Sequence, residues 1–124
     1  MTMKEAVASG VSLQPQRGAV EFLIMESRRI ALASIYQKVR RRALQPDLFG
    51  LSPEDLALDS IAEVYQRDER GRFPQLVGYF ESMSWQTLDE ASLFIAFRRL
   101  ILSKLNEGLF RRYKEADASL SKLI

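Results

Sequence analysis

The sequence predicts an all-α fold, a single small bundle of about four to five helices with a long central helix near the C-terminus, at about residues 88–115. Apolar side chains recur at the helical period over two long segments, 19–43 and 88–113. Between these segments, Ser52 and Pro53 are residue types that begin a helix. A chain of 124 residues has room for one domain, so we expect these helices to share one core.

The long helix is the element on which we expect the others to pack. Thr87 and Glu90 have the spacing of a capping box, which predicts that the helix begins there. Its apolar residues cover well over half of the helix circumference: Leu88, Ala91, Phe94, Ile95, Phe97, Ile101, Leu102, Leu105, Leu109 and Tyr113. A helix that is apolar over so wide an arc needs neighbours on at least two sides. Gly108 is its weak point, because glycine costs roughly 1 kcal/mol relative to alanine in a helix interior.

The first 43 residues divide into two parts. Residues 1–18 mix Ser, Gly, Gln and Pro with few large apolar groups, which predicts a flexible N-terminal arm and leaves 19–124 as one all-helical domain. A short helix from Met3 to Ala8 is the alternative for the start of the arm. Residues 19–43 have the pattern of an amphipathic helix. Its inner face is expected to hold Met25, Leu32, Ile35, Tyr36, Val39 and Ala43. The connection that follows contains a proline and a glycine, and we expect its Leu48 and Phe49 to enter the core.

A second helix is predicted from Pro53 to about Gln66. Its inner face would be Ala57, Leu58, Ile61, Val64 and Tyr65, and its outer face Asp55, Asp59, Glu63 and Gln66. Like charges at this spacing repel one another slightly, so helix stability does not explain the acidic face. It is either a solvated face or a docking face for a basic partner. Farther along, residues 73–81 predict a short helix, and Trp85 is either a plug of the core or an exposed stacking side chain.

Composition excludes several kinds of chemistry. The chain has no cysteine and no histidine, which removes thiol nucleophiles, imidazole acid–base catalysis and the usual zinc ligands. Its six glycines form no phosphate-binding loop. We therefore expect a protein that is not an enzyme and has no cofactor, no metal and no small-molecule substrate. The longest apolar run, residues 93–97, is far too short to span a membrane, and the N-terminus lacks a secretory signal, so a cytoplasmic location without membrane partners is expected.

Charge is unevenly distributed although the net charge is only +2. Two segments carry clusters of cations: Arg28, Arg29, Lys38 and Arg40 to Arg42 in the first, and Arg98, Arg99, Lys104, Arg111, Arg112 and Lys114 in the second. Clustered cations near aromatic rings are what a nucleic-acid surface needs, because phosphates attract cations and bases stack on rings. Phe110 is predicted on the polar strip of the long helix near Arg99 and Asn106, where it serves either a nucleic-acid surface or a second packing or dimer contact.

The order of these features resembles region 2 of the bacterial RNA polymerase sigma factors, of the extracytoplasmic-function type. The basic end of the first helix, IYQKVRRRAL, precedes SPEDLALDSIAEVYQ, which is similar to the acidic helix of that family. The segment FIAFRRLILSKLNEGLFRRY is similar to the family's aromatic and basic helices, with Phe97 in place of the signature tryptophan. The resemblance extends over about residues 20–113.

The resemblance implies two functional surfaces. Residues that would face RNA polymerase are Glu54, Asp55, Asp59, Glu63 and Gln66. Residues on or beside a surface that opens promoter DNA would be Phe94, Phe97, Arg98, Arg99, Asn106, Arg111 and Arg112, and the polar strip adds Phe110.

The expected function is therefore a non-enzymatic, transcription-related binding domain that docks on RNA polymerase, contacts promoter-like DNA, or does both. The alternative is a helical protein-interaction or homodimerisation module of unknown partner. That module would use the apolar surface of the long helix or the apolar residues Leu120, Leu123 and Ile124 at its end.

Overall fold

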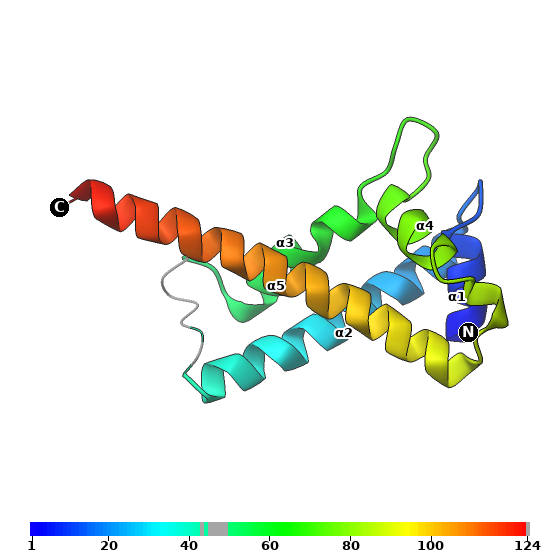
Figure 1. Ribbon diagram of the computed structural model, residues 1–124, viewed down its shortest axis with the longest axis horizontal. Helices are drawn as coiled ribbons and strands as arrows, with labels where there is room; N and C mark the ends of the chain where they lie inside the picture. The colour runs from blue at the N-terminus through cyan, green and yellow to red at the C-terminus, as the bar shows by residue number, and fades with distance from the viewer. Residues whose placement is uncertain (43, 45–49, 124) are drawn as a thin grey trace.

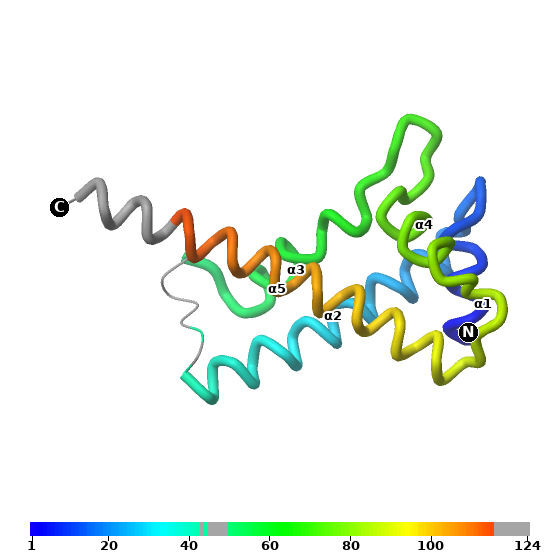
Figure 2. The backbone as a smooth tube through the Cα atoms, in the orientation of Figure 1, coloured from blue at the N-terminus to red at the C-terminus, as the bar shows by residue number. Residues whose placement is uncertain are grey.

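The computed structural model describes residues 1–42, 44 and 50–123, with side chains up to residue 115. These residues form an all-α bundle, as predicted, and contain no strand. The helices are α1 (Met3–Gly10), α2 (Arg17–Arg40), α3 (Pro53–Ile61), α4 (Pro74–Glu81) and α5 (Glu90–Leu123), with 3₁₀ turns η2 (Ala62–Tyr65) and η3 (Trp85–Thr87). In Figure 1, α2 and α5 cross at the centre, and α1 and α4 lie at one end of the molecule. The tube in Figure 2 shows that α3 lies beside α5.

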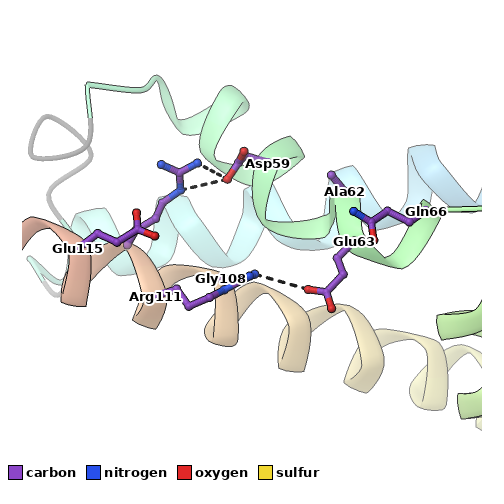
Figure 3. A pocket seen from close by; sticks show the side chains of 8 residues that line it. Asp59, Ala62, Glu63, Gln66, Gly108, Arg111 and Glu115 are labelled. Atoms are coloured by element: carbon purple, nitrogen blue, oxygen red, sulfur yellow. Dashed lines mark hydrogen bonds and ion pairs between the residues drawn. The ribbon is translucent and has the colours of Figure 1, made fainter.

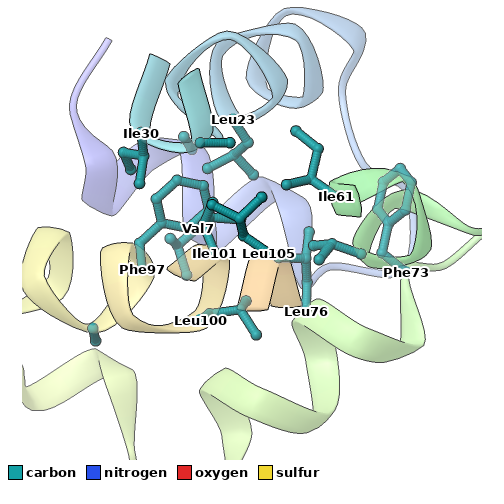
Figure 4. Close-up of a cluster of buried hydrophobic side chains, with 14 of the residues drawn as sticks. Val7, Leu23, Ile30, Ile61, Phe73, Leu76, Phe97, Leu100, Ile101 and Leu105 are labelled. Atoms are coloured by element: carbon teal, nitrogen blue, oxygen red, sulfur yellow. The ribbon is translucent and has the colours of Figure 1, made fainter. Parts of the chain in front are cut away.

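The core lies where α1, α2, α3, α4 and η2 meet α5. Figure 4 shows Val7 of α1, Leu23 of α2 and Ile61 of α3 turned toward Phe97 and Ile101 of α5. Because α2 and α3 both pack on α5, the prediction that this helix is covered from at least two sides is confirmed. Not all of its predicted apolar arc is used. Ile95 is 52% exposed, because helix neighbours cover only part of that arc.

The sequence predicts a mobile arm over residues 1–18, and this prediction is wrong for α1. That helix belongs to the core. Thr2 caps the helix by accepting a hydrogen bond of 3.1 Å from the Glu5 amide. Met3, Ala6 and Val7 are at most 2% exposed. Small and medium side chains at a spacing of three and four residues are enough to bury one face of an eight-residue helix against a preformed surface.

The predicted capping box at the start of α5 is wrong. Asp89 caps the helix instead, because its Oδ1 accepts a hydrogen bond of 2.7 Å from the Ser92 amide. Hydrogen bonds from the Ser92 side chain and then from its backbone amide lower the pKa of Asp89. Thr87 lies in η3, where its hydroxyl donates to the Ser84 carbonyl. The Glu90 carboxylate caps a different helix, since it accepts from the Met3 and Lys4 amides at the start of α1.

The buried face of α2 differs from the predicted one. Ile35 is buried as predicted, and Leu32 and Val39 are partly buried. Met25 and Tyr36, however, are 72% and 41% exposed, and the buried Leu23 and Ile30 were not among the predicted residues. The helix is apolar in more than one direction, so its periodicity does not choose the inner face. The positions of α1, α3 and α5 around α2 make that choice.

Gly108 marks the closest approach of α3 to α5. A Cβ atom at this position would lie 3.2 Å from the Cα of Ser60, which is tighter than ordinary van der Waals contact. The glycine that weakens α5 as an isolated helix therefore lets the two backbones approach each other. Trp85 is a plug of the core, at 9% exposure.

The predicted core residues Ala43, Leu48 and Phe49 lie outside the described residues. Across the described part of the chain, no helix has the length and apolar character needed to cross a membrane.

Candidate nucleic-acid interface

A groove runs between α2 and α5. Its cavity has a volume of about 390 Å³. The residues that line it are Arg29, Ile30, Ala33, Ser34, Gln37 and Lys38 of α2, and Phe94, Arg98, Leu102 and Asn106 of α5. Ile30 is buried, and Phe94 and Leu102 are half-buried, so apolar groups form its base. The result is an apolar floor with charged and amide side chains around it.

The electrostatics of this groove favour an anion. Arg29, Lys38 and Arg98 bring three cations to the groove, and none of the described residues that line it is a carboxylate. Arg29 pairs with Glu26, its neighbour one turn earlier on α2. Neither Lys38 nor Arg98 has an ion pair within the described part of the chain. Low-dielectric walls with charges of one sign concentrate the field inside a groove, which attracts counter-charged ligands.

Three of the residues predicted to contact nucleic acid lie together in this groove: Phe94, Arg98 and Asn106. The other predicted positions do not. Arg99 is exposed outside the groove, and its charge acts on Tyr79, whose pKa is raised mainly by burial. Phe110 is 61% exposed, as its place on the polar strip predicts, and the Lys114 ammonium lies 4.8 Å from its ring centre.

The structure contradicts the predicted contact of Phe97 with nucleic acid. Phe97 is fully buried, among the largest side chains of the core, and contacts no solvent. Figure 4 shows its ring close to Ile101, one turn along the same helix. Residues 97, 101 and 105 lie on the side of α5 that faces the other helices, so the aromatic residue at position 97 supports the fold and cannot stack on a base.

Residues of the predicted polymerase-facing acidic surface form ion pairs with residues of the predicted nucleic-acid surface. Arg112 donates from Nε and Nη2 to Asp59 Oδ2, the first of these at 3.1 Å. Arg111 Nη2 lies 3.5 Å from Glu63 Oε2. Figure 3 shows both pairs crossing a second cavity, between α3 with η2 and α5, where Gln66 also points. Two cations assigned to nucleic acid and two carboxylates assigned to a protein partner therefore neutralise each other within the chain.

The other two acidic positions have different surroundings. Glu54 accepts a hydrogen bond from the Tyr36 hydroxyl, and this bond is the main reason that the pKa of Glu54 is lowered. Asp55 is exposed in the first turn of α3, where its backbone amide donates to the capping Ser52 hydroxyl at 3.1 Å. Of the five predicted partner residues, only Asp55 and Gln66 make no side-chain bond or ion pair within the described chain.

Sequence reasoning missed the contribution of α2 to the groove beyond its cations. Ser34 and Gln37 add a hydroxyl and an amide to its lining. A signal for them exists, because residues 29, 33 and 37 and residues 30, 34 and 38 recur every four positions along α2. These residues form a stripe along α2, but the sequence does not say that this stripe faces α5.

Comparisons with protein families, with characterised proteins and with solved structures find no match for this chain. The described residues also contain no group of three or more acidic side chains placed to hold a metal ion. The function must therefore be argued from the grooves and the charges that surround them.

Proposed function

We propose that this chain is a non-enzymatic, transcription-related nucleic-acid-binding domain, similar to the core of the sigma factors, that holds a DNA strand in the groove between α2 and α5. One observation carries the proposal. The groove combines Arg29, Lys38 and Arg98 with the half-buried ring of Phe94, and no described carboxylate lines it. Cations bind phosphates, and an aromatic ring at the base of the groove gives a base a surface on which to stack.

The shape of the site favours an unpaired strand over a duplex. Reading of duplex DNA requires a protruding helix or ribbon that enters a groove of the DNA. Here the protein supplies the concave surface, which suits a strand whose bases can turn toward it. Single-stranded or forked DNA is therefore the proposed ligand. Docking on RNA polymerase through α3 has weaker support, because Glu54, Asp59 and Glu63 already bond within the chain.

The test is the salt dependence of binding to a labelled oligothymidylate of about 20 nucleotides, measured by fluorescence anisotropy. The double variant Lys38→Ala/Arg98→Ala removes two phosphate contacts, so the slope of log K against log salt should flatten by about 1.4. Arg17→Ala/Arg70→Ala is the matched control. It removes the same charge from exposed positions outside the groove. Equal slopes for the two double variants, or no binding by the unmodified chain at about 50 mM salt, would refute the proposal.

A second function has one observation in its favour. Ile95 and Phe110 are 52% and 61% exposed on α5, and apolar side chains that remain exposed on a long helix are common in protein interfaces. We propose self-association through α5 as this alternative. The side chains of Leu120, Leu123 and Ile124, which the sequence also assigns to it, lie outside those described. Sedimentation equilibrium tests the alternative: Ile95→Ser/Phe110→Ser should weaken a dimer, and a monomer at all concentrations would exclude it.

A further inference from the structure

The cavity between α3 and α5 is bridged by two ion pairs that join distant parts of the chain. Its lining includes Asp59 and Glu63 on one side and Arg111, Arg112 and a third carboxylate, Glu115, on the other. Figure 3 shows the two carboxylates turned toward the two guanidinium groups across the cavity. The Arg112 side chain is 25% exposed and that of Arg111 63% exposed, so solvent reaches both pairs.

The packing of α3 on α5 does not depend on these pairs. Below them, Ser60 lies against Gly108, and Leu56, Ile61 and Leu105 are at most 2% exposed. Solvent-exposed ion pairs contribute little to stability, because water screens them and the side chains lose freedom. Two exposed pairs are thus added to an interface that is already closed by apolar contact and close backbone approach.

The two arginines have the chemistry of a polyanion site. A guanidinium group binds a phosphate through the same pair of N–H donors that it offers to a carboxylate. Arg112 already uses Nε and Nη2 in this way on Asp59. Arg111 and Arg112 also lie five and six residues beyond Asn106 of the α2–α5 groove, about 7.5 to 9 Å along the helix axis. At 100° per residue they are turned about 140° and about 120° away from Asn106 around α5, so a strand that leaves the groove would have to wrap partly around the helix to reach them.

We infer that Asp59 and Glu63 take the place of phosphates and mask a second nucleic-acid contact made by Arg111 and Arg112. In this autoinhibitory arrangement, the groove binds a strand first, and the arginines join only when a phosphate displaces the carboxylates. Because the ligand is the nucleic-acid strand proposed above, this inference rests on that proposed function.

The experiment removes the charges of the two masking carboxylates, Asp59 and Glu63. Asp59→Asn/Glu63→Gln keeps the size of both side chains but removes their charge. The matched control Glu69→Gln/Glu81→Gln changes the net charge by the same amount at exposed positions outside the second cavity. Binding is measured with the labelled oligothymidylate, and circular dichroism checks that each variant remains helical. The masked arginines should add two phosphate contacts, which steepens the salt slope by about 1.4 in the first variant only.

Affinity should rise about 2- to 30-fold in Asp59→Asn/Glu63→Gln, the range expected for the loss of two competing surface ion pairs. Adding Arg111→Ala and Arg112→Ala to this variant should return the affinity and the slope to those of the unmodified chain. In the unmodified chain the same two alanine substitutions should have less than a twofold effect.

The inference and the proposed function fail separately. If Asp59→Asn/Glu63→Gln and its control Glu69→Gln/Glu81→Gln have the same affinity and the same salt slope, the masking inference is overturned. The same holds if neither variant binds the oligothymidylate. In the opposite case, these two variants differ as expected, but Lys38→Ala/Arg98→Ala has the same salt slope as its control Arg17→Ala/Arg70→Ala. Masking by Asp59 and Glu63 is then supported, and the proposal that the α2–α5 groove is the primary site is refuted.

Discussion

Glu90 gives the most direct test of how the N-terminal helix is held. Its carboxylate lies at the start of α5 but accepts hydrogen bonds from the Met3 and Lys4 amides, 87 and 86 residues away in sequence. These amides belong to the first turn of α1, where helix geometry leaves backbone N–H groups without partners. An eight-residue helix does not persist alone in water, so α1 depends on such contacts.

The substitution Glu90→Ala should destabilise the chain by about 1 to 2 kcal/mol. Removal of a capping side chain costs about 0.5 to 2 kcal/mol. The Met3 bond is partly buried, which raises its contribution, whereas the Lys4 amide is exposed and regains a bond to water. For a domain of this size, the loss corresponds to a decrease in melting temperature of about 4 to 8 °C.

Urea denaturation followed by circular dichroism measures the change, with Thr87→Ala as the control. Under the capping box that the sequence predicts, the two substitutions would cost similar amounts. In the structure Thr87 makes only a local bond to Ser84, so its replacement should cost less than about 0.5 kcal/mol. Hydrogen exchange of the α1 amides should accelerate in Glu90→Ala alone. Equal costs for both variants, with unchanged exchange in α1, would refute the role assigned to Glu90.

Three further predictions concern single side chains. Phe97→Leu should lower stability by about 1 to 1.5 kcal/mol in urea denaturation and leave oligothymidylate affinity unchanged, because this ring is fully buried. Phe94→Ala should instead weaken oligothymidylate binding about 5- to 100-fold in anisotropy titrations, and a smaller loss than for Phe110→Ala would contradict the stacking role of the groove. Burial raises the pKa of Tyr65 above the ordinary 10.0, so the folded chain keeps a proton that the unfolded chain releases above about that pH. Stability should therefore fall as pH rises beyond about 10, and Tyr65→Phe should show a shallower fall in urea titrations at increasing pH, although it also loses the bond to Ser27.

Local chemistry was enough to predict several elements of the fold. Ser52 caps α3 and Pro53 occupies its first turn, as their residue types predict, because cap and proline effects act within one turn. The wide apolar arc of α5 predicted a helix that is packed from two sides. The exposure of Phe110 also followed from its angular position on that helix. The candidate site was predicted in part, since Phe94, Arg98 and Asn106 do share a groove.

Tertiary structure decided which partner each side chain has. Helical periodicity places Glu90 on a face of α5 but contains nothing about α1, which supplies the amides that it caps. The same periodicity places Arg112 in line with the buried Ile101 and Leu105, and only the approach of α3 at Gly108 brings Asp59 to it. The physical reason is the range of the interactions. Capping and amphipathicity act over a few residues along the chain, whereas burial, ion pairing and groove formation depend on segments that packing alone brings together.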